Sequence, residues 1–273
     1  MTARFIDSSG GQIFALARAP HGSVRGAVLL VPPFAEEMNK SRRMYTELAV
    51  RLASEGIATV LPDLHGTGDS QGEFREADWQ RWKSNLLAAA RWAESEGWSV
   101  RGVLATRLGC ALAMEAMQDG LPGVSGCVFW QPVTDGARFL SQFLRLRVAA
   151  ALMEEDRAES VGELRSRLKR GEVIEVAGYE LTGRLADQIE SVRLGELLGS
   201  SHCPLDWMEV VREQGSGLPT PSTQTISQAR SKGADITVHT TAGGAFWTSV
   251  EIVTVPELID RSVSVLCSRV SAA

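Results

Sequence analysis

The sequence is poor in cysteine, and its few cysteines are scattered. Of 273 residues, four are cysteine: Cys110, Cys127, Cys203 and Cys267. No two of them form a C-x-x-C pair or another spacing typical of a metal site. This argues against a small disulfide framework or a zinc ribbon. We therefore expect reduced, mostly buried thiols, and neither a metal nor another cofactor.

Excess positive charge and long apolar runs are also missing. The formal net charge of -5 argues against a general nucleic-acid-binding protein. The apolar stretch at residues 139–153 is interrupted by Arg145 and Arg147, so it is too short and too charged to span a bilayer. The first residues lack the basic-then-apolar pattern of a secretory signal. We expect a cytoplasmic protein without a membrane span.

What the sequence does contain is a regular alternation of strand-like and helix-like segments. An antiparallel hairpin is expected over residues 4–19, at the edge of a sheet. The pattern then predicts strands at 26–33, 57–64, 100–106, 125–133, 204–213 and 234–242, and helices at 41–56, 77–97, 108–120, 222–233 and 255–270. Such alternation predicts an α/β protein with a mostly parallel, doubly wound sheet.

The alternation is interrupted once. Residues 135–200 contain helical stretches and the segment VIEVAGYELT, but no strand that clearly continues a parallel sheet. An inserted helical cap is the simplest interpretation. We therefore expect a core formed by residues 1–134 and 201–273, with residues 135–200 as a cap.

Two motifs in this order resemble the α/β-hydrolase fold. Residues 63–72, DLHGTGDSQG, match a D-x-x-G-x-G-x-S turn of that superfamily, and ATRLGC stands at the sharp strand-to-helix turn called the nucleophile elbow. Aligning Gly109 with the last glycine of G-x-Ser-x-G places Arg107 at the nucleophile and Ala105 at the first glycine. An arginine stays protonated and has no lone pair for nucleophilic attack.

No neighbouring side chain is a convincing substitute for the nucleophile. Thr106 lies one position early. Cys110 lies three positions late, within the expected helix, and we favour a structural core cysteine. Ser70 is more typical of a turn residue.

The other members of a catalytic triad are not visible either. The loop at residues 212–222 offers Glu213 but no aspartate, and Asp135 is an alternative acid. The loop expected to carry the histidine reads GGAFWTSVE and contains none. We expect His239 to be a packed or hydrogen-bonded strand residue, and His65 to lie at the surface, as a cap or at the pocket rim. A base held on a nucleophile by a third group is therefore not visible.

Several longer stretches resemble one branch of this superfamily, the exosortase A system-associated hydrolase 2 family. They are VPPFAEEMNKSRRM, DLHGTGDSQGEF, ATRLGC, WQPV, FLSQFLRLR, VAGYEL and GAFWTSVEIV. The resemblance implies descent from hydrolases, an exopolysaccharide or protein-sorting context, and an elbow arginine as a family trait. The chain departs from it in the Ala-Thr that precedes Arg107, where Trp-Gly or Gly-Leu is expected.

An arginine at an elbow has two physical interpretations. The start of the following helix already favours an anion, and a guanidinium adds a forked donor for a carboxylate or phosphate. Alternatively, Arg107 pairs internally with Glu36, Glu37 or Glu251 and fills the old pocket, because an unpaired buried arginine is costly. Both remain open from the sequence.

The remaining candidate residues would surround Arg107. Arg145 on the first cap helix is expected either to face the cleft or to lie on an exposed helix face. The full set of expected ligand contacts is Phe34, Glu36, Glu37, Arg107, Leu108, Arg145, Phe246 and Trp247, with Glu36, Glu37 and Asp135 as possible catalytic acids.

Three functions fit these observations. The first is a non-hydrolytic protein that binds a small anionic, acyl or glycosyl ligand. The second is an ester, thioester or amide hydrolase in which an acid activates water and Arg107 stabilises the oxyanion. The third is a scaffold for another pathway protein. An open pocket at Arg107 would favour ligand binding, and a pocket closed by an ion pair would favour the scaffold.

Overall fold

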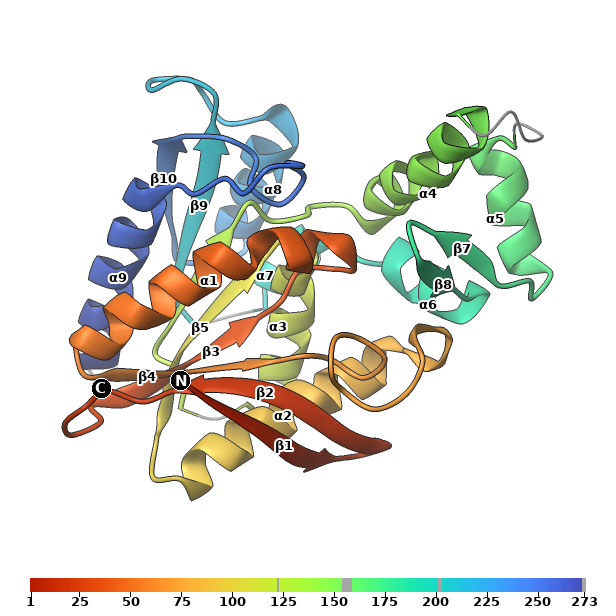
Figure 1. The fold of residues 1–273 in the computed structure, drawn as a ribbon. Coiled ribbons are helices and arrows are strands. Elements are labelled where there is room, and N and C mark those ends of the chain that lie inside the picture. The colour runs from red at the N-terminus through yellow and green to blue at the C-terminus, as the bar shows by residue number, and fades with distance from the viewer. Residues whose placement is uncertain (122, 154–158, 201–202, 272–273) are drawn as a thin grey trace.

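An eight-stranded sheet forms the centre of the computed structural model, which describes residues 1–273 except 122, 154–158, 201–202 and 272–273 (Figure 1). Its strands lie in the order β1-β2-β4-β3-β5-β6-β9-β10. Strand β2 runs antiparallel to its neighbours β1 and β4, and the other paired strands are parallel. The strands are β1 (Thr2–Ser8), β2 (Gly11–Arg18), β3 (Gly26–Val31), β4 (Ile57–Pro62), β5 (Val100–Thr106), β6 (Gly126–Trp130), β9 (Leu205–Val211) and β10 (Ile236–Ala242).

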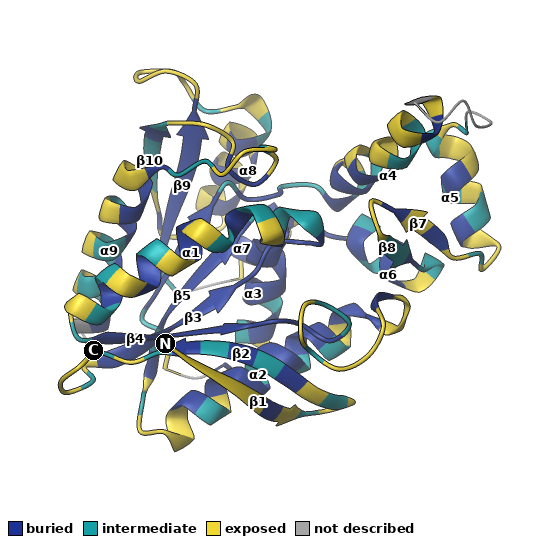
Figure 2. Cartoon of the chain, in the orientation of Figure 1, coloured by how far each residue is buried: buried dark blue, intermediate teal, exposed yellow. Residues whose placement is uncertain are grey.

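Helices cover both faces of this sheet. Helices α1 (Glu36–Ser54) and α9 (Pro256–Ser271) lie together on one face, while α2 (Trp79–Ser95) and α3 (Gly109–Gln118) pack together on the other. Helix α8 (Thr220–Ser231) connects β9 to β10. Every residue of β3, β4, β6 and β9 is buried, as expected for strands covered on both sides (Figure 2). The sheet thus separates two apolar cores.

Helix α1 begins earlier than the sequence pattern predicted. It starts at Glu36 rather than at Ser41, and its first turn contains Glu36 and Glu37. Carboxylates in a first turn are favoured by the exposed amides and the helix dipole. The additional turn places Glu37 and Lys40 beside the elbow, which matters for the site below.

The chain between β6 and β9 leaves the sheet and forms a separate group of helices with one small β pair (Figure 1). These are α4 (Gly136–Met153), α5 (Val161–Lys169), the two-stranded pair β7 (Ile174–Val176) and β8 (Tyr179–Leu181), and α6 (Gly183–Glu190). We call residues 136–190 the cap. The short helix α7 (Leu194–Leu198) follows it and packs against α3 and α8 instead.

Aromatic contacts fasten the cap to the core. Phe34, in the loop after β3, meets Phe139 and Phe143 of α4 with ring centroids 5.7 and 5.0 Å apart. Phe74 meets Tyr179 of β8 at 5.0 Å. Across the described ranges, no helix is both long and apolar enough to cross a membrane.

Candidate functional site

The elbow has the sharp geometry that the motif predicted. Strand β5 ends at Thr106 and helix α3 begins at Gly109, so only Arg107 and Leu108 make the turn. Arg107 has φ 57°, in the left-handed region that side chains other than glycine rarely adopt. Its amide donates to the carbonyl of Trp130 at 3.0 Å, which fixes the turn to the end of β6. The elbow is retained, with a cation at its tip.

Gly109 explains why the motif keeps its last glycine. A Cβ atom at this position would lie 2.4 Å from the carbonyl oxygen of Pro32. Helix α3 therefore begins in direct contact with the backbone that follows β3. Ala105, at the first glycine position, is fully buried and fits there with its methyl group.

The side chain of Arg107 is held by three partners. Its Nε donates to Oε1 of Glu37 at 3.1 Å, and its Nη1 donates to the carbonyl oxygen of Gln131 at 3.3 Å. Its guanidinium carbon lies 5.3 Å from the ring centroid of Trp247, a cation–π contact. Of the three glutamates considered as partners, Glu37 forms the ion pair, while Glu251 is exposed.

Glu37 is an incompletely satisfied carboxylate. Its side chain is 15% exposed, and its Oε2 is buried without a hydrogen-bond partner among the described residues. Burial raises the pKa of Glu37 above its ordinary value, against the opposing effect of Arg107. Because Oε2 makes no hydrogen bond, it can hold a proton.

A second buried glutamate lies behind the elbow, and sequence reasoning missed it. Glu209 of β9 accepts hydrogen bonds from Gln131 Nε2 at 3.0 Å, Trp207 Nε1 at 2.7 Å and Ser222 Oγ at 3.2 Å. Burial raises its pKa, and the hydrogen bonds from Trp207 and Ser222 and the charge of Arg107 oppose that rise. Gln131, whose carbonyl holds Arg107, thus links Arg107 to Glu209.

A cavity of about 260 Å³ opens above the pair of Arg107 and Glu37, between the core and the cap. Its apolar walls come from the loop after β3, from α4 and from the loop after β10. Arg107 and Glu37 form part of its floor, and Glu36 and Lys40 lie at its mouth. The lining residues are Phe34, Glu36, Glu37, Lys40, Arg107, Phe139, Gln142, Phe143, Leu146, Trp247 and Thr248.

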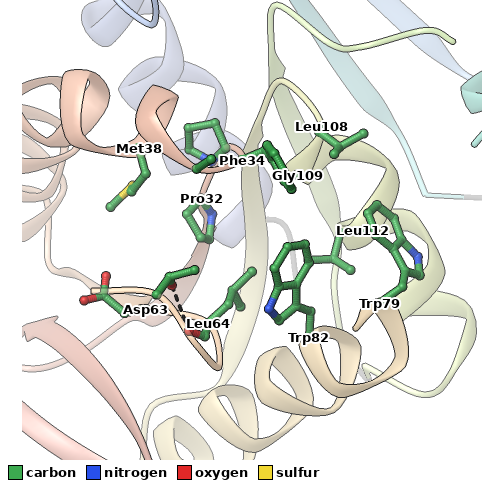
Figure 3. A pocket seen from close by; sticks show the side chains of 13 residues that line it. Pro32, Phe34, Met38, Asp63, Leu64, Trp79, Trp82, Leu108, Gly109 and Leu112 are labelled. Atoms are coloured by element: carbon green, nitrogen blue, oxygen red, sulfur yellow. Dashed lines mark hydrogen bonds between the residues drawn. The ribbon is translucent and has the colours of Figure 1, made fainter. Parts of the chain in front are cut away.

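Phe34 also lines a second, smaller hollow (Figure 3). It measures about 30 Å³, and its walls include Trp79 and Trp82 of α2 and Leu112 of α3. That volume suits a water or two and not an organic ligand.

The cavity brings together five of the eight expected ligand contacts: Phe34, Glu36, Glu37, Arg107 and Trp247. The other three lie elsewhere. Leu108 lines the smaller hollow, because the elbow turns its side chain toward α2. Phe246 is fully buried against Trp130, with ring centroids 5.8 Å apart. Arg145 is exposed on α4, where it lines a surface hollow with Arg138 and Arg165.

The possible catalytic acid Asp135 is likewise outside the cavity. Its Oδ1 accepts from the amide of Arg138 at 2.7 Å, at the start of α4, and its Oδ2 lies 3.6 Å from Nε of Arg193. It therefore fixes the entry to the cap. Glu213 is exposed in the loop after β9.

The candidate nucleophiles have structural roles. Cys110 is fully buried in α3, and burial raises its pKa well above the ordinary value, so it is an inert thiol as expected. Thr106 accepts from the hydroxyl of Tyr45 at 2.7 Å. Ser70 bridges the carbonyl of Asp63 and the amide of Phe14, which confirms a turn residue.

The two histidines considered for catalysis are also occupied. His239 of β10 lies 2.8 Å from Asp206 Oδ1, which confirms a hydrogen-bonded strand residue. His65 was expected at the surface or pocket rim, and this was wrong: it is 3% exposed, with Nε2 2.7 Å from Nη1 of Arg81. The glycine-rich turn at residues 66–72 folds over it. Among the described cavity-lining residues, none is a serine, cysteine or histidine.

The part of the chain that the structure describes contains no group of three histidine, cysteine or acidic side chains able to hold a metal ion. The site offers a fixed guanidinium, a carboxyl group with one oxygen unbonded, and an apolar cavity. This arrangement can bind an anion with an apolar body.

Comparison with known proteins identifies the fold. No model of a known family and no curated protein matches the sequence. Among solved structures, Est1E from Butyrivibrio proteoclasticus with bound ferulic acid is 13% identical, with a TM-score of 0.71 over 98% of this chain and 100% of that chain. A thermostable carboxyl esterase from Bacillus coagulans is 11% identical, with a TM-score of 0.67 over 98% of both chains.

A peptidase has the same fold. The proline iminopeptidase from Mycobacterium smegmatis is 12% identical, with a TM-score of 0.64 over 99% of both chains. At such low identity these likenesses show the fold and not the reaction. The chain has the α/β-hydrolase fold, as the sequence predicted.

Proposed function

We propose that this protein binds a small amphipathic anion in the cavity between the elbow and the cap, and that it does not use the elbow as a nucleophile. The anionic group would contact Arg107, and the apolar body would lie against the aromatic walls. One observation carries the proposal: the elbow residue is an arginine whose guanidinium forms part of the floor of an apolar cavity.

The electrostatics of the elbow support an anionic head group. Arg107 stands directly before the first turn of α3, where helix amides and the helix dipole favour negative charge. Its Nη1 is held by the Gln131 carbonyl, so the guanidinium is already ordered before a ligand arrives. A preordered fork loses little entropy on binding a carboxylate.

The walls favour an acyl or aryl body over a glycosyl one. Five lining side chains are apolar: Phe34, Phe139, Phe143, Leu146 and Trp247. A sugar would leave many hydroxyl groups without partners against such walls, whereas an aliphatic or aromatic group would gain from burial. Ferulic acid, which Est1E binds, is an aromatic carboxylic acid. We propose a ligand of this general chemistry.

The resemblance of the sequence to the exosortase A system-associated family suggests where such a ligand belongs. We propose that the protein serves an exopolysaccharide or protein-sorting pathway in the cytoplasm. The cavity remains open although Arg107 is ion-paired, which favours ligand binding over a purely scaffolding role.

Glu37 supports a second candidate, a hydrolase with an unconventional site. Its Oε2 has no partner within the described residues, and burial raises its pKa, as is common for a general base. A water held by the Glu37 carboxylate at the cavity floor would attack an ester or thioester whose oxyanion faces Arg107.

Calorimetry with octanoate tests the proposal. We expect the wild type to bind it, and Arg107→Asn to bind at least tenfold more weakly, because asparagine tolerates the left-handed backbone but removes the charge. The matched control Arg145→Asn, on the exposed face of α4, should bind like the wild type. No binding by the wild type, or equal binding by Arg107→Asn, would overturn the proposal.

Reactivity separates the two candidates. We expect no labelling by a fluorophosphonate and no turnover of short or long acyl esters and thioesters. Turnover that is lost in both Arg107→Asn and Glu37→Gln, without labelling, would establish the hydrolase instead.

A further inference from the structure

The cavity contains its own counter-ion at the place where a ligand anion would bind. Glu37 contacts Arg107 through a single hydrogen bond, from Nε to Oε1 at 3.1 Å. An arginine fork can bind a carboxylate through two parallel hydrogen bonds, so this contact is a partial one. A ligand carboxylate and Glu37 therefore require the same guanidinium.

The charges that line the cavity are balanced. Glu36 and Glu37 are acidic, and Lys40 and Arg107 are basic. An entering anion would create a net negative charge between apolar walls, where an uncompensated charge is strongly unfavourable. Uptake of one proton restores the balance.

We propose that Glu37 competes with the anionic group of the ligand for Arg107, and that Glu37 takes up a proton from solvent when the ligand displaces it. This inference rests on the proposed anion-binding function. The proton binds at the carboxyl group of Glu37, and no other bond forms or breaks. Binding of the anion and binding of the proton are thereby coupled.

The alternative proton acceptors are less suitable. Glu209 accepts three hydrogen bonds, so protonation would disturb a satisfied network. Glu36 accepts from Asn39 Nδ2 at 2.9 Å, near the mouth. Among the described residues of the cavity, Glu37 is the one whose carboxyl group has a buried oxygen without a hydrogen bond.

The other groups that face Glu37 are two buried side chains of the core and one lysine at the mouth. Burial raises the pKa values of Tyr45 and Cys110, so both stay neutral. Lys40 donates to the Thr248 carbonyl at 3.1 Å. The facing residues of α4 and of the loop after β10 are uncharged: Phe139, Gln142, Phe143, Leu146, Trp247 and Thr248.

Two effects act on Glu37 in opposite directions. The first turn of α1 and Arg107 favour its charged form, whereas burial disfavours it. Burial is the larger effect and raises the pKa of Glu37. Loss of the contact with Arg107 on ligand binding would raise it further, which brings protonation closer to neutral pH.

Calorimetry with octanesulfonate between pH 5 and pH 8.5 tests the coupling, since a sulfonate stays charged throughout this range. Two buffers of different ionisation enthalpy report the protons taken up. For the wild type we expect uptake of up to one proton, and an affinity that rises by up to about tenfold for each pH unit of acidification. Glu37→Gln should bind without proton uptake, equally well at all pH values, and more tightly than the wild type at pH 8.5.

The matched control is Glu213→Gln, which removes an exposed carboxylate outside the cavity and should retain the coupling. Binding by the wild type without proton uptake, or unchanged pH dependence in Glu37→Gln, would overturn the inference and leave the proposed function intact. No binding by the wild type at any pH would overturn both, whether or not Glu37→Gln binds.

Discussion

Two glutamates, the buried Glu209 and the partly buried Glu37, flank Arg107, and they differ in how completely they are bonded. Glu209 lies behind the elbow and accepts hydrogen bonds from Gln131, Trp207 and Ser222. Glu37 forms part of the cavity floor, and its Oε2 has no partner among the described residues. Burial raises the pKa of both groups. The bonding, and not the pKa shift, distinguishes them.

This difference suggests that the two glutamates have different roles around Arg107. A fully bonded buried carboxylate stabilises a single arrangement of its neighbours. A carboxylate with an unbonded oxygen can exchange partners at low cost in free energy, because fewer hydrogen bonds are broken. We therefore assign Glu209 and its three donors to a fixed frame behind the elbow. Glu37 belongs to the cavity floor in front of the elbow, where its bonding can change when a ligand binds.

Removal of Glu209 should have the largest effect on stability. Glu209→Ala would leave the donors of Gln131, Trp207 and Ser222 without their acceptor, and we expect the free energy of unfolding to fall by about 3 kcal/mol. Urea denaturation measures this loss. Glu213→Ala, in the exposed loop after the same strand, should change stability little. Equal stability of both variants would contradict a supporting role for Glu209.

A substitution at Gly109 should disturb the elbow itself, where α3 begins against the loop after β3. In Gly109→Ala the new methyl group would meet the Pro32 carbonyl oxygen at 2.4 Å, so α3 or the loop after β3 must shift. We expect a loss of about 2 kcal/mol in the free energy of unfolding. Gly22→Ala is the control, because no atom lies within 4 Å of its added methyl group. A Gly109→Ala variant as stable as wild type would show that the elbow does not need this close contact.

Arg107 and Glu37 at the cavity floor were easier to predict from the sequence than Glu209 in the frame behind the elbow. Gly109 and the turn at residues 63–72 located Arg107, and the position of Glu37 after β3 made it one of three possible partners. Glu209 lies within a strand buried on both faces, where no alternation marks an inward-facing polar residue. Its partners Gln131 and Ser222 come from distant segments that only the folded sheet brings together.

The sequence also does not reveal which of two neighbouring side chains faces the cavity. Phe246 and Trp247 are adjacent in the loop after β10, yet Trp247 lines the cavity and Phe246 packs under it. Which of two consecutive aromatics faces inward depends on backbone angles that an irregular loop does not reveal in its sequence. Arg145 poses the same problem on α4, because the helix pattern gives the spacing of its faces but not the direction of the core.

The smallest expected effect concerns the pH dependence of stability at Glu37. Its pKa is raised in the folded protein, so the folded state binds more protons than the unfolded state between the ordinary pKa and the raised one. Stability contributed by the protonated form is therefore present at low pH and is lost as pH rises through that window. Glu37→Gln cannot lose a proton, so the variant should gain stability relative to wild type between pH 4 and pH 8. Urea denaturation at the two pH values checks this, and a relative change of the opposite sign would mean that Arg107, rather than burial, dominates the environment of Glu37.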